Sequence, residues 1–282
     1  LLAVVGIRYI ADGYARAVAR LGLSERDIDG DPSVFQRTVS PRSKLVVYVL
    51  GAALLTAHVV FNMAPRIVSI AGLPGLVHRV LLWNAYLLFV VEFASLYFSL
   101  HVLVPRRLSA AGVGMFYYDP ENMGGFGPLG RLLKRSYYVY TAGLLLFLVI
   151  VYGPVTLASM NAPGGASVSS RVAPTTTAFF TLAWVVGVLS IAYSMRTIHR
   201  LMATDKRRHL SRLEAELREA IANPYEITSA EDADEDRLSD IERRLDQVRS
   251  TRVYPATFTM WSQIAVSVLF PQALQLLLQA TG

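Results

Sequence analysis

Glu92 is the residue whose type and position most suggest chemistry, because it is a carboxylate inside an otherwise apolar stretch near 80–104. A charge in such a stretch costs several kcal/mol unless it is paired, hydrated or protonated, and such residues often mark the paths of ions or protons. His58, in the apolar stretch that precedes it, is the candidate partner of this carboxylate.

Two sets of polar residues, each spaced to share one face of a helix, extend this pattern. They are Asn84, Glu92, Ser95 and Ser99 in the second apolar stretch, and Gln272, Gln275 and Gln279 in the fifth. A polar stripe of this kind faces a bundle interior or water rather than lipid. It can line a permeation path, or it can hold helices together by hydrogen bonds, and the sequence leaves both interpretations open.

Two prolines inside apolar stretches are candidate hinges. Pro154 follows Gly153 in the third stretch, and Pro271 lies in the fifth. Proline removes a backbone donor and kinks a helix, although membrane helices commonly tolerate it. A hinge at either position would let one part of a helix move during gating.

Oxygen-bearing side chains that could bind Ca²⁺ or Mg²⁺ occur in two places, in neither case with the spacing of an EF-hand. They are Asp119 and Glu121 in a glycine-rich segment, 105–136, and Asp232, Asp234 and Asp236 in an acidic run. The glycine-rich segment lacks the Gly-Lys-Ser/Thr ending of a P-loop. We therefore expect no metal ion and no cofactor, and we interpret the segment as a structured connector or as a re-entrant or gating loop.

No catalytic signature accompanies these residues. The sequence contains no HExxH, GxSxG, Walker A or dinucleotide-binding pattern. It also contains no cysteine, which excludes thiol nucleophiles and thiolate metal sites. We therefore expect that the protein is not an enzyme.

The elements that must position these side chains are five apolar stretches, near 45–64, 80–104, 137–160, 176–195 and 257–279. A helix needs about 20 apolar residues to cross a hydrocarbon core of roughly 30 Å. The predicted fold is therefore all-α, a polytopic membrane bundle of about five spans.

The basic residues give this bundle an orientation. When the segments between stretches are assigned alternately to the inside and the outside, all 27 Lys and Arg residues except Arg66, Arg79 and Arg171 fall inside. None of the 21 Asp and Glu residues falls in an outside loop. The positive-inside rule then predicts a cell-membrane protein with a cytoplasmic N-terminus and an external C-terminus. The net charge of +6 thus indicates anionic lipid headgroups as partners, not nucleic acid.

Two cytosolic elements flank the first four spans. Residues 1–44 are predicted to form an amphipathic helix and a linker, and the helix either lies in the headgroup plane or packs on the protein's own surface. Residues 196–256 carry two apolar seams, and each seam is too short to form a coiled coil alone. Together they predict an antiparallel helical hairpin. The seams are Leu210, Leu213, Leu217 and Ala220, and Leu238, Ile241, Leu245 and Val248. The predicted domains are therefore 1–44, 45–195, 196–256 and the last span, 257–282.

Two short motifs carry a resemblance. The stretch from Asp119 to Gly130, an Asp-Pro followed by Gly-Gly-Phe-Gly-Pro-Leu-Gly, is similar to a pattern in uncharacterised multi-span membrane proteins of prokaryotes. The same is true of Val253-Tyr254-Pro255, which opens the last span. Those proteins have a Gly-Gly-Leu-Gly-like turn, from which this chain departs at Phe126. The resemblance implies membership of a multi-span membrane family and implies no activity.

The polar stripes favour an oligomeric ion channel or pore that is gated from the cytosolic side. The second or fifth span would line its path in a homo-oligomer, and the absence of outer carboxylates mildly favours anions. The alternative is a non-conducting membrane scaffold or signalling subunit, whose helical hairpin docks a cytosolic protein partner. The sequence begins at Leu1 and not at Met, which is compatible with further residues before it, such as a cleaved signal or a tag.

Overall fold

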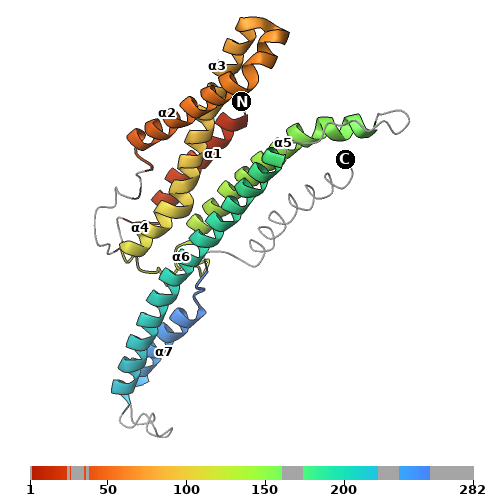
Figure 1. Ribbon diagram of the computed structural model, residues 1–282. Helices are drawn as coiled ribbons and strands as arrows, with labels where there is room; N and C mark the ends of the chain where they lie inside the picture. Colours follow the sequence, from red (N-terminus) through yellow and green to blue (C-terminus); the bar gives the residue numbers. More distant parts are fainter. Residues whose placement is uncertain are drawn as a thin grey trace.

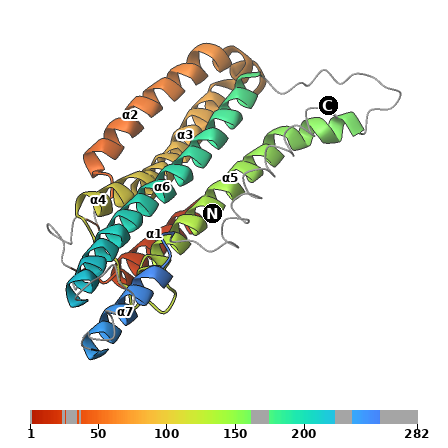
Figure 2. The same ribbon diagram turned by 90° about the horizontal axis from the view of Figure 1, so that it is seen from below.

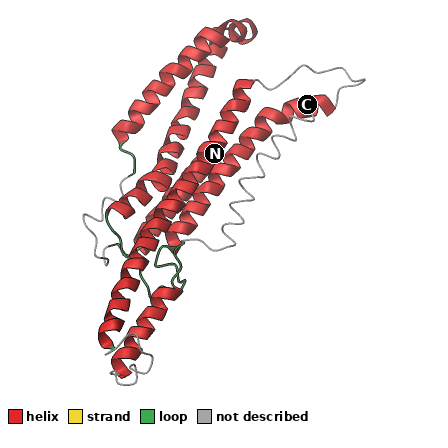
Figure 3. Cartoon of the chain, turned by 60° about the horizontal axis from the view of Figure 1, so that its bottom comes forward, coloured by secondary structure: helices red, strands yellow, loops and turns green. Residues whose placement is uncertain are grey.

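The computed structural model describes residues 2–23, 26, 35, 38–160, 174–221 and 235–254, and within these ranges the regular structure is helical, without strands (Figures 1 and 3). The helices are α1 (Leu2–Arg20), α2 (Pro41–His58), η2 (Val59–Met63), α3 (Ala64–Phe98), η3 (Ser99–Leu103), α4 (Val104–Ala110), α5 (Gly127–Met160), α6 (Pro174–Ala220) and α7 (Glu235–Ser250). Both η2 and η3 are single π-helical turns. The all-α prediction is confirmed for these residues.

Three helical segments of the described residues are long and apolar enough to cross a membrane: Pro41–Ala110, Gly127–Ile150 and Thr177–Ala220. The first of them contains two of the predicted spans, 45–64 and 80–104. Its two helices, α2 and α3, lie side by side and run in opposite directions (Figure 1). The predicted fifth span, 257–279, lies outside the described residues. The apolar helices indicate a membrane protein.

The α2–α3 hairpin has no open loop at its turn. Ser40 caps α2, because its side chain accepts a hydrogen bond from the Ser43 N–H, and Pro41 follows at the first helical position. The chain then stays helical through η2 and most of α3, with one residue of non-helical backbone at Gly72, whose φ is 67°. The arms approach closely at Gly51, where an added Cβ would lie 3.1 Å from Leu87 Cδ2.

Both ends of the glycine-rich segment are helical. Residues 105–110 belong to α4, and residues 127–136 belong to α5. Only residues 111–126, here called the glycine-rich loop, are non-helical. The α5 helix continues through Gly153 and Pro154 to Met160, and its C-terminal end bends away from the other helices (Figure 2). A hinge role for Pro154 stays a prediction.

The main buried cluster lies at the end of the bundle where α1, α4, α5, α6 and the glycine-rich loop meet. Its fully buried members include Ile10, Leu108, Phe126, Leu133 and Ile198. By contrast, the α2–α3 hairpin leaves many apolar side chains uncovered, such as Phe61 at 81% exposure. An apolar surface of this extent is expected to face lipid or another chain.

The N-terminal helix packs on the protein's own surface through one face. An added Cβ at Gly13 would lie 3.2 Å from Leu132, and one at Gly6 would lie 3.2 Å from Val139, so α1 runs antiparallel along α5. Tyr14 is buried, and its hydroxyl donates to the Phe35 carbonyl. The face of α1 that includes Ile10 is therefore occupied by protein, as one of the two sequence interpretations requires.

The α7 helix packs antiparallel on the charged half of the 47-residue α6 (Figures 1 and 2). Arg244 Nη2 forms an ion pair with Glu216 Oε2 at 2.8 Å. The apolar seams of the two helices meet in one buried cluster, formed by Leu213, Ile241, Leu245 and Val248. The chain between the two helices lies outside the described residues.

Candidate functional site

Asp119 organises the glycine-rich loop. Its Oδ1 accepts the N–H of Glu121 at 3.0 Å, and its Oδ2 accepts the N–H groups of Met123 at 3.0 Å and Gly125 at 2.8 Å. A carboxylate with this many backbone donors stabilises a turn. Asp119 is one of the residues that could bind a cation by their chemistry, and in this structure its oxygens accept backbone N–H groups of its own loop.

Gly125 is required by both backbone conformation and space. Its φ is 77°, a region that favours glycine. An added Cβ would lie 2.2 Å from Arg26 Nη2. The Arg26 guanidinium also donates from Nη1 to the Gly114 carbonyl at 2.8 Å, and its Cζ lies 5.2 Å from the centre of the Phe126 ring. Burial lowers the pKa of Arg26, while Asp119 and Asp205 act in the opposite direction.

Of the other candidate cation ligands, one is in an ion pair, one is exposed, and two lie outside the described residues. Glu121 forms an ion pair with Arg131 Nη1 at 2.6 Å. Asp236 is exposed in the first turn of α7, and Asp232 and Asp234 are outside the described residues. Within the described ranges, His, Asp and Glu side chains form no group of three or more that could hold a metal ion.

Asp205 of α6 binds the loop to that helix. The Asp205 side chain is buried between the loop and α6, with the residue only 8% exposed. Its Oδ2 accepts the Met115 N–H at 2.8 Å and the Tyr117 hydroxyl at 3.1 Å. The Tyr117 hydroxyl also lies 3.2 Å from His209 Nδ1. Burial, followed by the effect of Asp205, raises the pKa of Tyr117 above its usual value, so that the phenol stays a hydrogen-bond donor.

The same loop is bound to the end of α7. Gln247 Nε2 donates to the Tyr117 carbonyl at 2.6 Å, and the Arg252 N–H donates to the Asn122 carbonyl at 2.8 Å. Lys206, next to Asp205 on α6, donates to the Thr251 carbonyl at 2.7 Å, and burial lowers its pKa. The loop, α6 and the end of α7 are therefore joined by hydrogen bonds into one unit, here called the loop junction.

Sequence reasoning missed Asp205. One signal was available: it is the only acidic residue between Arg196 and Arg212, a strongly basic stretch. Burying an isolated carboxylate costs free energy unless specific partners compensate for it. A single acidic residue in a basic stretch is therefore a candidate for such partners.

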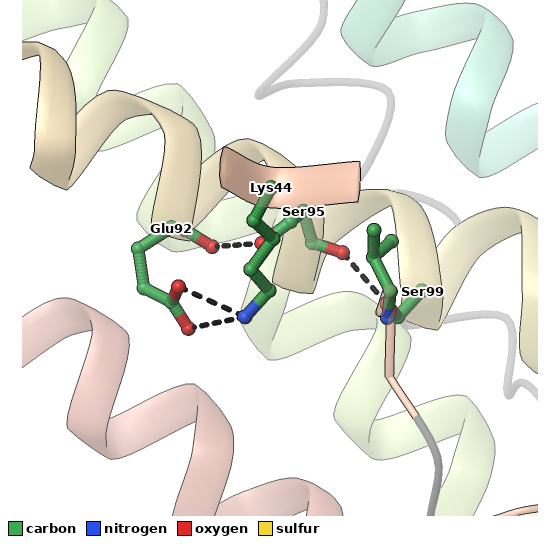
Figure 4. A network of polar contacts seen from close by, with 5 residues as sticks. Lys44, Glu92, Ser95 and Ser99 are labelled. Atoms are coloured by element: carbon green, nitrogen blue, oxygen red, sulfur yellow. Dashed lines mark hydrogen bonds and ion pairs between the residues drawn. The ribbon is translucent and has the colours of Figure 1, made fainter. Parts of the chain in front are cut away.

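The predicted pairing of Glu92 with His58 is wrong. Both carboxylate oxygens of Glu92 lie 2.8 Å from Lys44 Nζ (Figure 4), whereas His58 Nδ1 lies 3.3 Å from Asn62. The reason is the antiparallel register, which places the first turn of α2 opposite Glu92 and the last turn of α2 opposite Asn84. The predicted pairing rests on the similar depth of the two residues in their apolar stretches, and depth alone does not give the register of two helices.

The other members of the first polar stripe form bonds within the chain. Asn84 Nδ2 donates to Thr56 Oγ1 of α2 at 3.1 Å. Ser99 Oγ accepts the Val39 N–H at 3.1 Å and donates to the Ser95 carbonyl at 2.7 Å, as part of the network in Figure 4. The Asn84–Thr56 contact supports the interpretation of the stripe as interhelical bonding, whereas the Ser99–Ser95 bond lies within one helical segment. Gln272, Gln275, Gln279 and Pro271 lie outside the described residues.

A second buried polar cluster was not singled out by the sequence. His101 of η3 is fully buried, with Nε2 at 2.8 Å from Ser136 Oγ of α5 and Nδ1 at 3.2 Å from Ser194 Oγ of α6. The Tyr97 ring lies 4.2 Å from the imidazole. Both serines are also fully buried, so a substrate would have no access to a serine–histidine pair here. The arrangement instead links three helices.

Comparison with known proteins adds no family to these observations. No protein-family model matches the chain. No curated protein is significantly similar to it. No solved structure is significantly similar to it either.

Proposed function

We propose that this chain is a multi-pass membrane subunit that transmits the state of its membrane helices to the α6–α7 pair, as a scaffold or signalling protein. The observation that carries the proposal is the loop junction. The chain runs helically from Leu73, just after the non-helical Gly72, to Ala110 and then enters a loop that binds both α6 and the end of α7. A shift of α3 and α4 therefore moves groups that hold the two charged helices.

The proposed topology has five spans, with the N-terminus and the α6–α7 pair in the cytoplasm and the C-terminus outside. The distribution of basic residues supports this orientation. The α6 helix supports it as well, because it is apolar near its start and strongly charged beyond Arg196. The fifth span would be the segment 257–279.

Cysteine labelling tests this topology without background, because the chain has no cysteine. We expect Ser169→Cys and Thr281→Cys to react with a membrane-impermeant maleimide on intact cells. Ser250→Cys, at the exposed end of α7, is expected to react only after permeabilisation. The cysteine-free parent is the control. Labelling of Ser250→Cys on intact cells would contradict the orientation, and internal Thr281→Cys would contradict the fifth span.

The proposed transmission from the membrane helices to the α6–α7 pair is here called the relay. It predicts that a change in the α2–α3 hairpin reaches α7 through Asp205. Lys44→Gln removes the ion pair with Glu92, and Arg42→Gln removes an exposed charge of the same sign from the same turn as a matched control. We expect Lys44→Gln to accelerate amide exchange in α7 by about 2- to 30-fold, since energetic coupling between sites typically amounts to about 0.5–2 kcal/mol. Hydrogen exchange of the reconstituted protein measures it.

In an Asp205→Asn background, the effect of Lys44→Gln on α7 is expected to be smaller, because the contact that carries it is weakened. Equal α7 exchange rates in the parent, Lys44→Gln and Arg42→Gln proteins would show that α7 does not sense the hairpin. An effect that persists unchanged in Asp205→Asn would place the coupling elsewhere.

A homo-oligomeric channel is the second candidate, and the Lys44–Glu92 pair is the observation that favours it. The Glu92 side chain is 48% exposed and is the only acidic side chain of the α2–α3 hairpin, so in a membrane its ion pair with Lys44 needs the interface, another chain or water. The same reconstituted protein distinguishes the two functions in a liposome flux assay. The relay predicts no ion flux, whereas a channel predicts flux that changes with Glu92→Gln and not with Arg42→Gln.

A further inference from the structure

A cavity of about 800 Å³ lies where the C-terminal end of α1, the glycine-rich loop and the start of α5 meet. Three arginines line it, Arg20, Arg26 and Arg131, and they come from three separate segments of the chain. Convergence of three guanidinium groups on one cavity requires a counter-charge, because like charges repel at short range in a partly desolvated site.

The two carboxylates in the lining do not supply all of that counter-charge. The oxygens of Asp119 accept three backbone N–H groups of the loop, and Glu121 is paired with Arg131. With three arginines and two carboxylates, the lining has one more formal positive charge than negative charge, and Asp205, outside the lining, also acts on Arg26. Arg20 is exposed, and among the described residues no acidic side chain is bonded to it.

We propose that this cavity binds a phosphate-bearing anion, with Arg20 and Arg26 as its principal donors. A guanidinium presents paired N–H groups that match phosphate oxygens in geometry and charge. Gly22, Gly114 and Gly125 in the lining keep the backbone free of side chains, while Leu21 and Phe116 supply an apolar wall. The ligand chemistry is that of a lipid headgroup or of free phosphate.

The site does not depend on the proposed relay, because it rests on different residues and needs neither signalling nor ion flux. It also differs from a P-loop, since the charge comes from arginine side chains of separate segments and not from a lysine that ends a glycine-rich turn. The position near α1 brings the cavity close to the predicted inner headgroup region, where anionic lipids are available.

Binding is tested with full-length, delipidated protein in neutral detergent, using two probes. Inorganic phosphate is titrated at constant ionic strength by calorimetry, and dioleoyl phosphatidylglycerol adducts are counted by native mass spectrometry. We expect saturable binding in at least one arm, and the responding arm identifies the source. Arg20→Gln is expected to weaken that binding about fivefold, the effect of losing one partly exposed charge contact.

Two further variants distinguish a built site from general attraction. Arg16→Gln, an exposed arginine one turn earlier on α1 that does not line the cavity, is expected to bind like the parent protein. Glu121→Gln removes a negative charge and frees Arg131, so it is expected to bind more tightly, an effect that a purely structural role in the loop would not produce. The proposal is overturned if neither probe binds the parent saturably. It is also overturned if Arg16→Gln loses as much as Arg20→Gln, or if Glu121→Gln binds more weakly.

Discussion

Asp205→Ala is expected to destabilise the folded protein by about 3 kcal/mol, because it breaks a buried hydrogen-bond network. The Met115 N–H would lose the acceptor that it has in the loop junction. The Tyr117 hydroxyl would lose a bond of 3.1 Å and keep only His209 as a side-chain partner. Without these contacts, the Tyr117–His209 contact is the side-chain hydrogen bond that the described part of the loop keeps to α6.

Thermal unfolding in detergent, followed by intrinsic fluorescence, measures this effect. A loss of about 3 kcal/mol corresponds to a melting temperature about 6–12 °C lower for a chain of this size. Asp205→Asn should cost less, because its amide oxygen can still accept from Met115. Asp246→Ala removes an exposed carboxylate from α7 and is the matched control, with an expected change within about 0.5 kcal/mol. Equal melting of the Asp205→Ala and Asp246→Ala proteins would show that the junction contributes nothing to stability.

Local patterns in the sequence were sufficient to predict the helices. Apolar stretches and seams at spacings of three and four depend only on neighbouring residues, which is why the apolar parts of α2, α3, α5 and α6 and the seam of α7 could be identified. The role of Asp119 was also within reach, since an aspartate that accepts N–H groups just after it is a known turn former. From the sequence, Asp119 is predicted only as a possible oxygen ligand, and no metal ion is expected there.

Contacts between distant residues could not be predicted in the same way. Asp205 and Met115 are 90 positions apart in the chain, and no local spacing connects them. The wrong partner for Glu92 has the same origin, because the register of α2 on α3 depends on contacts between distant residues, such as the close approach of Gly51 to Leu87. A pairing inferred from similar depth in two apolar stretches ignores this constraint.

His101→Ala is expected to destabilise the protein by about 3 kcal/mol, mainly by leaving a cavity the size of an imidazole where three helices meet. His101 has no exposed surface, and it contacts Ser136 of α5 and Ser194 of α6. Interhelical hydrogen bonds in membrane bundles contribute only about 0.6 kcal/mol on average, so the lost bonds are the smaller part. His58→Ala, an exposed histidine of α2 that contacts Asn62, is the matched control and should change little.

A double-mutant cycle separates the bond from the cavity. In a neutral imidazole one nitrogen donates and the other accepts, so His101 can be a donor to one serine and an acceptor from the other. Ser136→Ala alone is therefore expected to cost about 0.6 kcal/mol, and in the His101→Ala background it should cost almost nothing, because its partner is already gone. If the serine substitution has the same cost in both backgrounds, the 2.8 Å contact contributes no stability. The histidine would then hold the three helices together by its volume alone.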